Sequence, residues 1–163
     1  MTRRLILIRH AKSSWDDPAL SDHERPLNQR GRRAAPLIGA WLRENGYRPD
    51  EVLCSDAVRA RETLTALGLE APVTYLSRLY HAEPETILAV LREAQGRVVV
   101  IVGHNPGMAE FADRILAAPP EHPRFDDFPT AATLVADFDI DDWPEAAFGT
   151  AGAVDFVIPR ELE

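Results

Sequence analysis

The sequence has one cysteine, one lysine and no long apolar run, and two of these shortages exclude whole classes of protein. Cys54 has no second thiol, so neither an internal disulfide nor a cysteine metal cluster can form. The apolar stretch 5–8 is shorter than the roughly 7–15 apolar residues of a secretory signal, and nothing approaches the roughly 18 that suggest a membrane span. We therefore expect a cytoplasmic protein with no membrane partner.

Negative charge prevails over most of the chain but not at its N-terminal end. The 163 residues include 18 Lys and Arg against 26 Asp and Glu, a formal charge of −8. Residues 1–33 hold eight basic and four acidic groups (+4), whereas residues 34–163 hold ten basic and 22 acidic groups (−12). The acidic majority argues against a nucleic-acid partner, while the basic segment can attract a small anionic group.

Short apolar runs alternate with helical patterns along the chain. The continuous runs 5–8 and 98–102 are typical of parallel strands covered on both faces. Further strands are expected at 52–54, 73–76, 132–138 and 153–158, with helices between the earlier ones. Pro36 conflicts with a helix that starts as early as Asn28, so the first helix is expected to start later or to be kinked. The sequence thus predicts a single domain over residues 1–163, with a three-layer α/β/α fold and a mostly parallel central sheet.

Two of the expected central strands run directly into a histidine. His10 follows Arg9 at the end of the first strand, and His104 follows Gly103 at the end of the long apolar strand. Ligands of such sheets bind beyond the carboxyl ends of the strands. Asn105 and Pro106 are typical of a helix start, so His104 is expected at a helix N-terminus, which favours an anion.

A third strand end supplies an arginine. Ser55 and Asp56 follow the expected strand 52–54 and begin a helix, and Arg59 lies in its first turns, off the apolar stripe. Arg9 and Arg59 together offer two guanidinium groups, whose planar forks suit a phosphate. These residues predict a phosphate site at the strand ends.

Four ordered motifs resemble the histidine phosphatase (phosphoglycerate mutase-like) superfamily. The order, the spacing and the short chain are most similar to its SixA-type phosphohistidine phosphatase branch, and the resemblance covers residues 5 to about 115. The motifs are Leu7-Ile8-Arg9-His10-Ala11, Arg25-Pro26-Leu27-Asn28-Gln29-Arg30-Gly31, Ser55-Asp56-Ala57-Val58-Arg59-Ala60-Arg61-Glu62-Thr63 and Val102-Gly103-His104-Asn105-Pro106-Gly107.

The resemblance implies a phosphoglycerate mutase-like fold and a phosphatase that works through a phosphohistidine intermediate on His10, without a metal or another cofactor. It implies a phosphate site made by Arg9, Arg59 and His104, to which we add Asn105 as a substrate-binding residue. The substrate implied is a phosphohistidine in a protein. A small-molecule phosphomonoesterase of the same superfamily and a non-catalytic phosphate-binding module remain the alternatives.

The chain departs from the family pattern at three points. Ala11 replaces a glycine, and Asp56 replaces a proline. The general-acid glutamate of the mutases has no counterpart, since Arg78 stands in the aligned stretch; the substitutes considered are Glu83, Asp16 and Asp17. The missing acid favours a phosphoramidate substrate, because a phosphohistidine imidazole leaves more easily than an alkoxide.

Other readings of the reactive residues are weaker. A cysteine phosphatase centred on Cys54 lacks the required arginine spacing and glycine cradle, and the histidines lack the spacing of a metal hydrolase. Ser13 and Ser14 have no base partner at a recognisable spacing. The remaining histidines are expected to be solvated loop residues: His23, His81 and His122.

Overall fold

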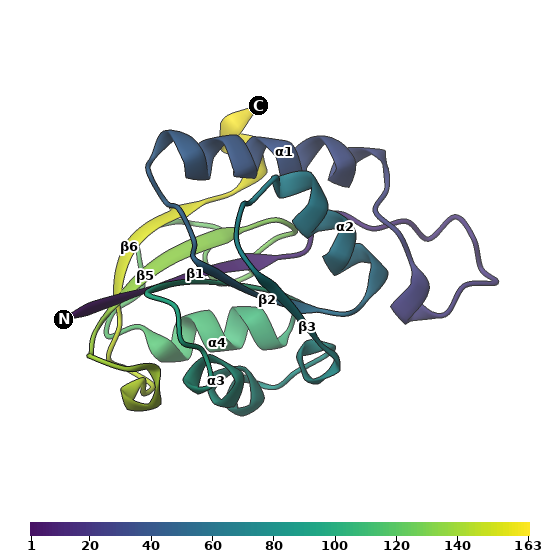
Figure 1. Ribbon diagram of the computed structural model, residues 1–163. Coiled ribbons are helices and arrows are strands. Elements are labelled where there is room, and N and C mark those ends of the chain that lie inside the picture. Colours follow the sequence, from purple (N-terminus) through teal and green to yellow (C-terminus); the bar gives the residue numbers. More distant parts are fainter.

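The computed structural model describes all 163 residues and contains one six-stranded sheet (Figure 1). The strand order is β3-β2-β4-β1-β5-β6. The first four strands in this order are mutually parallel, whereas β5 runs antiparallel to both β1 and β6. The strands are β1 (Thr2–Arg9), β2 (Glu51–Ser55), β3 (Val73–Leu76), β4 (Val98–Gly103), β5 (Thr133–Asp139) and β6 (Gly152–Val157).

Four α-helices cover the sheet, two on each face (Figure 1). Helices α1 (Gln29–Glu44) and α2 (Val58–Leu67) pack against one face, and α3 (Pro84–Arg92) and α4 (Gly107–Ile115) pack against the other. The predicted three-layer fold with a mostly parallel sheet is confirmed. No helix combines the length and apolar character needed to cross a membrane.

The two apolar runs form the centre of the sheet. Successive residues of β1 alternate between the two cores, with Ile6 and Ile8 facing α1 and α2, and Leu5 and Leu7 facing α3 and α4. Every side chain from Leu5 to Ile8 is fully buried, as expected when helices cover both faces of a strand. This packing holds the carboxyl ends of β1 and β4 in register, with Arg9 beside Gly103.

Of the two alternatives for the first helix, a later start and a kink, the later start was wrong. Helix α1 begins at Gln29, and the Asn28 side chain caps it by accepting the backbone N–H of Gly31 at 2.9 Å. Pro36 lies inside the helix. A proline costs one backbone hydrogen bond there, but the helix buries Ile38 and Leu42 against the sheet. Tertiary packing therefore outweighs the local cost.

Candidate active site

The two strand-end histidines lie together, as the sequence predicted. Because β1 and β4 are parallel neighbours, their carboxyl ends place His10 and His104 at the same edge of the sheet. The two ring centroids are 5.1 Å apart. Both residues are buried, with 6% and 3% of their surface exposed.

Arg59 and Arg9 bring positive charge to this pair. Arg59 comes from the first turn of α2, is 2% exposed, and places its Nε 3.4 Å from His10 Nε2. The Arg9 Nη1 donates to the carbonyl of Phe128 at 3.3 Å, which ties the arginine to the loop before β5. Burial lowers the pKa of Arg9 from its usual value, but a guanidinium remains charged at neutral pH.

Both histidines are neutral at physiological pH. Burial is the main cause that lowers the pKa of His10, to about 3; the bond to Ala11 opposes the shift, and the charges of Arg59 and Arg9 add to it. Burial, followed by the proximity of His10 and Arg59, lowers the pKa of His104 to about 2. Both imidazoles therefore keep an unprotonated nitrogen.

Hydrogen bonds indicate which nitrogen of His10 carries the proton. Its Nδ1 lies 2.6 Å from the carbonyl of Ala11. A carbonyl only accepts, so Nδ1 must be the protonated nitrogen. The lone pair is then on Nε2, the atom that lies near Arg59. A neutral, nucleophilic nitrogen thus lies beside a fixed cation.

Two buried polar atoms of this group have no hydrogen-bond partner in the protein, Arg9 Nε and His104 Nδ1. Buried polar groups are nearly always bonded, and those that are not call for an explanation. An anion bound between Arg9, Arg59 and His104 would accept from Arg9 Nε, and from His104 Nδ1 in the tautomer that has its proton there. The arrangement therefore suits an anionic group held beside the His10 lone pair.

Comparison with known proteins agrees with this geometry. The sequence pattern of the histidine phosphatase superfamily (branch 1) matches residues 5–82. An uncharacterized protein of Mycobacterium tuberculosis is 38% identical over 160 residues, which cover 94% of this chain and all of that protein. A solved structure from Nakamurella multipartita, described as a candidate phosphohistidine phosphatase SixA, is 31% identical with a TM-score of 0.85, over 98% of this chain and 97% of that one.

The chain belongs to the histidine phosphatase superfamily. A second SixA-type structure, from Agrobacterium tumefaciens, is 29% identical with a TM-score of 0.79, over 96% of this chain and 99% of that one. These relatives place the histidine phosphatase in the SixA-type branch, and the protein is a phosphatase. The resemblance found in the four motifs is confirmed.

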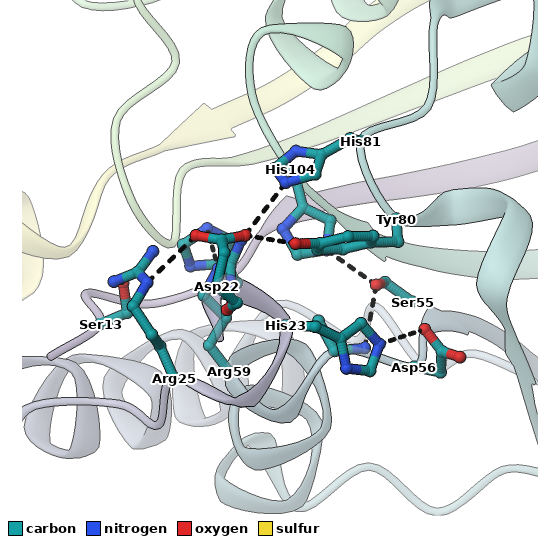
Figure 2. A network of polar contacts seen from close by, with 12 residues as sticks. Ser13, Asp22, His23, Arg25, Ser55, Asp56, Arg59, Tyr80, His81 and His104 are labelled. Carbon is teal, nitrogen blue, oxygen red and sulfur yellow. Dashed lines mark hydrogen bonds and ion pairs between the residues drawn. The ribbon is translucent and has the colours of Figure 1, made fainter. Parts of the chain in front are cut away.

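Asp22 is the centre of a second polar group, which sequence reasoning missed (Figure 2). It lies in the short 3-10 turn Asp22–Glu24, in the loop between β1 and α1. Its carboxylate is 2.9 Å from Arg59 Nη2 and 3.1 Å from Arg25 Nε, and it accepts the hydroxyl hydrogen of Tyr80. His81 Nε2 lies 3.0 Å from the same carboxylate.

The Asp22 carboxylate is ionised at neutral pH. Burial alone would raise its pKa, but hydrogen bonds from Tyr80, Arg59 and His81 lower the pKa well below its usual range. Asp22 therefore accepts protons in hydrogen bonds and does not donate one. Its bonds to Arg59 connect the second polar group to the pair His10 and His104.

The loop histidines, which were expected to be solvated, each contact a carboxylate. His81 keeps half of its side-chain surface exposed, but it contacts Asp22, and its ring centroid is 5.5 Å from that of His104. His23 Nε2 lies 2.8 Å from a carboxylate oxygen of Asp56. His122 is away from this group, bonded to Glu161 and mostly buried.

The other predicted residues contribute differently. The amide of Asn105 donates to the carbonyls of Asp127 and Phe128, and its oxygen accepts from Ala109. The Asn105 side chain thus fixes the loop that also contacts Arg9. The acids considered as proton donors all have exposed side chains, and none joins the polar group around Asp22: Glu83, Asp16 and Asp17.

Proposed function

We propose that this histidine phosphatase removes phosphate from phosphohistidine in a protein, through a covalent intermediate on His10. The observation that carries the proposal is the neutral His10 Nε2 beside Arg59, with the unpartnered Arg9 Nε and His104 Nδ1 at the same site. Phosphoryl transfer mainly needs positioning and charge stabilisation. This set of residues supplies both.

The reaction has two displacements on phosphorus. The Nε2 lone pair of His10 attacks, and the bond from phosphorus to the substrate breaks. Water then attacks the phosphoryl group on His10 and releases phosphate. Splitting hydrolysis in this way replaces one difficult step with two easier ones. The Ala11 carbonyl holds the Nδ1 proton of His10 throughout, so the ring leaves the phosphoryl group as a neutral imidazole.

We assign the phosphate oxygens to Arg9, Arg59 and His104. Two guanidinium groups can balance the charge of a phosphoryl group by bidentate hydrogen bonds. We therefore propose that the reaction needs no metal ion. Asn105 does not contact the phosphate in this proposal. Its amide holds the loop of Phe128, whose carbonyl also accepts a hydrogen bond from Arg9.

A phosphohistidine substrate fits the ionised state of Asp22 better than a phosphate ester does. The carboxylate of the polar group, Asp22, is ionised and cannot protonate an alkoxide. An imidazole leaving group needs a weaker acid. The candidate phosphohistidine phosphatase of Nakamurella multipartita, 31% identical over nearly the whole chain, supports this choice.

The test is to trap the intermediate and compare substrates. The wild-type protein and His10→Ala are each mixed with a ³²P-phosphohistidine peptide, quenched in alkali and mapped. We expect acid-labile phosphate on His10 in the wild type, none in His10→Ala, and turnover unaffected by EDTA. Faster turnover of phosphoglycerate than of the peptide would instead indicate a small-molecule phosphomonoesterase. Equally slow hydrolysis by both proteins would indicate a binding module.

A further inference from the structure

We propose that His81 is the group that gives a proton to the leaving group, and that Asp22 is the positioning residue that orients it. This inference rests on the proposed function, because it names the acid for the transfer to His10. The starting point is a histidine–carboxylate pair, His81 Nε2 with Asp22, beside the predicted phosphate site (Figure 2).

The geometry places His81 next to the reacting groups. The rings of His10 and His81 both lie against the ring of His104, with centroids at 5.1 and 5.5 Å. The Asp22 carboxylate that contacts His81 also contacts Arg59, whose Nε lies near His10 Nε2. Arg59 and the histidine–carboxylate pair are therefore parts of one connected network.

His81 combines access with a fixed orientation. Half of its side-chain surface is exposed, so a substrate can reach it. Its backbone φ of 53° lies in the left-handed region, which residues other than glycine seldom adopt. Such backbones persist where the surrounding structure holds them, often at functional sites. Tyr80, with its ring centroid 4.1 Å away, packs against the imidazole.

The neighbouring groups are poorer proton donors. Asp22 is ionised at neutral pH, so it has no proton to give. Burial and the adjacent Asp22 carboxylate raise the pKa of Tyr80, and its hydroxyl hydrogen is committed to that carboxylate. Histidine is the side chain that exchanges protons most readily between pH 5 and 8. Asp22 binds His81 through Nε2, so the second ring nitrogen is free to exchange a proton with the leaving group.

The proton balance closes over one cycle. In the first step, His10 Nε2 bonds to phosphorus, the P–N bond of the substrate breaks, and its imidazole takes a proton from the His81 imidazolium on its other ring nitrogen. In the second step, water attacks phosphorus, the bond to His10 breaks, and neutral His81 takes the proton of the water. The enzyme returns to its initial state. One proton therefore passes from His81 to the leaving imidazole and is replaced from water in each cycle.

The experiment compares leaving groups that differ in their need for a proton. Wild type and His81→Asn are assayed for kcat/KM on two aryl phosphates. The leaving group of 2,4-dinitrophenyl phosphate departs without a proton, whereas that of phenyl phosphate needs protonation. Asparagine tolerates a positive φ but donates no proton at neutral pH. The matched control is His122→Asn, at a histidine bonded to Glu161.

We expect His81→Asn to raise the ratio of the two kcat/KM values, dinitrophenyl over phenyl, by about 100-fold, the order that acid catalysis contributes. His122→Asn should leave the ratio at its wild-type value. An equal loss on both substrates would show a structural role and overturn the proposal. An unchanged ratio would overturn it as well.

Two further variants keep the proposal testable if His81→Asn folds poorly. Asp22→Asn should raise the same ratio by about tenfold, and the double variant with His81→Asn should not exceed His81→Asn alone. If the two substitutions raised the ratio additively in the double variant, Asp22 and His81 would not act together in the proton transfer. A rise of the ratio in Tyr80→Phe as large as the one expected for His81→Asn would assign the proton to Tyr80 instead.

The outcomes separate this inference from the proposed function. If the wild type forms a phosphohistidine on His10 and His81→Asn keeps the wild-type ratio, only the role of His81 fails. If the wild type forms no phosphoenzyme with the phosphohistidine peptide or either aryl phosphate, the proposed function fails.

Discussion

His104 Nε2 lies 2.7 Å from the hydroxyl oxygen of Ser55, and both groups are buried. The hydroxyl oxygen also accepts the backbone N–H of Ala57 at 3.2 Å. When Ser55 donates its hydroxyl hydrogen to Nε2, His104 has the tautomer with a hydrogen on Nδ1, the atom without a partner in the protein. We expect Ser55, at the end of β2, to favour this tautomer, in which His104 offers a donor to the phosphate.

The first prediction concerns Ser55→Ala. Without the hydroxyl, the neutral imidazole of His104 can take the other tautomer, which presents a lone pair to the phosphate. We expect kcat/KM on 2,4-dinitrophenyl phosphate to fall by about 10–100-fold, as for other partners that orient a functional histidine. The control is Ser77→Ala, at an exposed serine of the 3-10 turn Ser77–Leu79. Wild-type kinetics in Ser55→Ala would contradict the assigned tautomer.

The second prediction is a pH profile. Burial lowers the pKa of His10 to about 3, so the nucleophile remains unprotonated at all pH values well above 3. Between pH 8 and pH 6, kcat/KM on 2,4-dinitrophenyl phosphate should therefore not fall through protonation of the nucleophile. An unburied imidazole would protonate near pH 6.5. A loss of about fourfold over this interval in stopped-flow assays would show that His10 titrates normally.

The third prediction concerns stability against pH. The pKa values of His10 and His104 are lowered to about 3 and 2, so between pH 6.5 and pH 4 the unfolded chain binds protons that the folded protein does not. Stability is therefore lost as pH falls. Each histidine contributes up to about 1.4 kcal/mol per pH unit to the free energy of unfolding. Urea titrations at pH 7 and pH 5 measure this loss.

The variant His10→Gln provides the comparison for that measurement. It removes one of the two buried histidines, so its free energy of unfolding should fall less steeply between pH 7 and pH 5. Asp22 does not interfere, because its unfolded carboxyl titrates near pH 3.9, below this interval. Equal slopes in wild type and His10→Gln would argue against a buried neutral His10.

The fourth prediction concerns Cys54. Burial raises the pKa of its thiol to about 12, and the side chain is fully enclosed by the core on the α1 and α2 face. Iodoacetamide should therefore leave turnover unchanged in the folded protein. Cys54→Ala should keep wild-type kcat and lose about 1–2 kcal/mol of stability, through the small cavity that it creates. If iodoacetamide inactivated the wild type but not Cys54→Ala, a cysteine phosphatase mechanism would be supported instead.

The central sheet was predictable because its apolar strands and the alternation of strands with helices can both be recognised in the sequence. Residues 5–8 and 98–102 are continuously apolar, since helices cover both faces of the sheet, and the structure extends them to Thr2–Arg9 and Val98–Gly103. A later start was one of the two alternatives for helix α1, because Pro36 costs one local hydrogen bond. The burial of Ile38 and Leu42 outweighs that cost. A prediction from local helix propensity does not include the free energy of this burial.

The candidate site divides in the same way. His10 and His104 follow strands directly, and Arg59 lies in the first turn of the helix after β2, so strand position and topology sufficed to bring them together. Asp22 and His81 lie in loops, and their contact depends on how two distant loops fold over the strand ends. One sequence clue was available: Asp22 stands three residues before Arg25, close enough for a turn to join their side chains.

The division between strand ends and loops has an evolutionary consequence. The groups proposed to hold the phosphoryl group lie at the ends of β1 and β4 and in the first turn of α2, where a shift in backbone would disturb the core. Asp22 and His81 lie in the loop after β1 and the turn before α3, which can be exchanged without repacking the sheet. Substitutions in these loops can therefore change which leaving group the enzyme accepts, while the phosphate-binding residues stay the same.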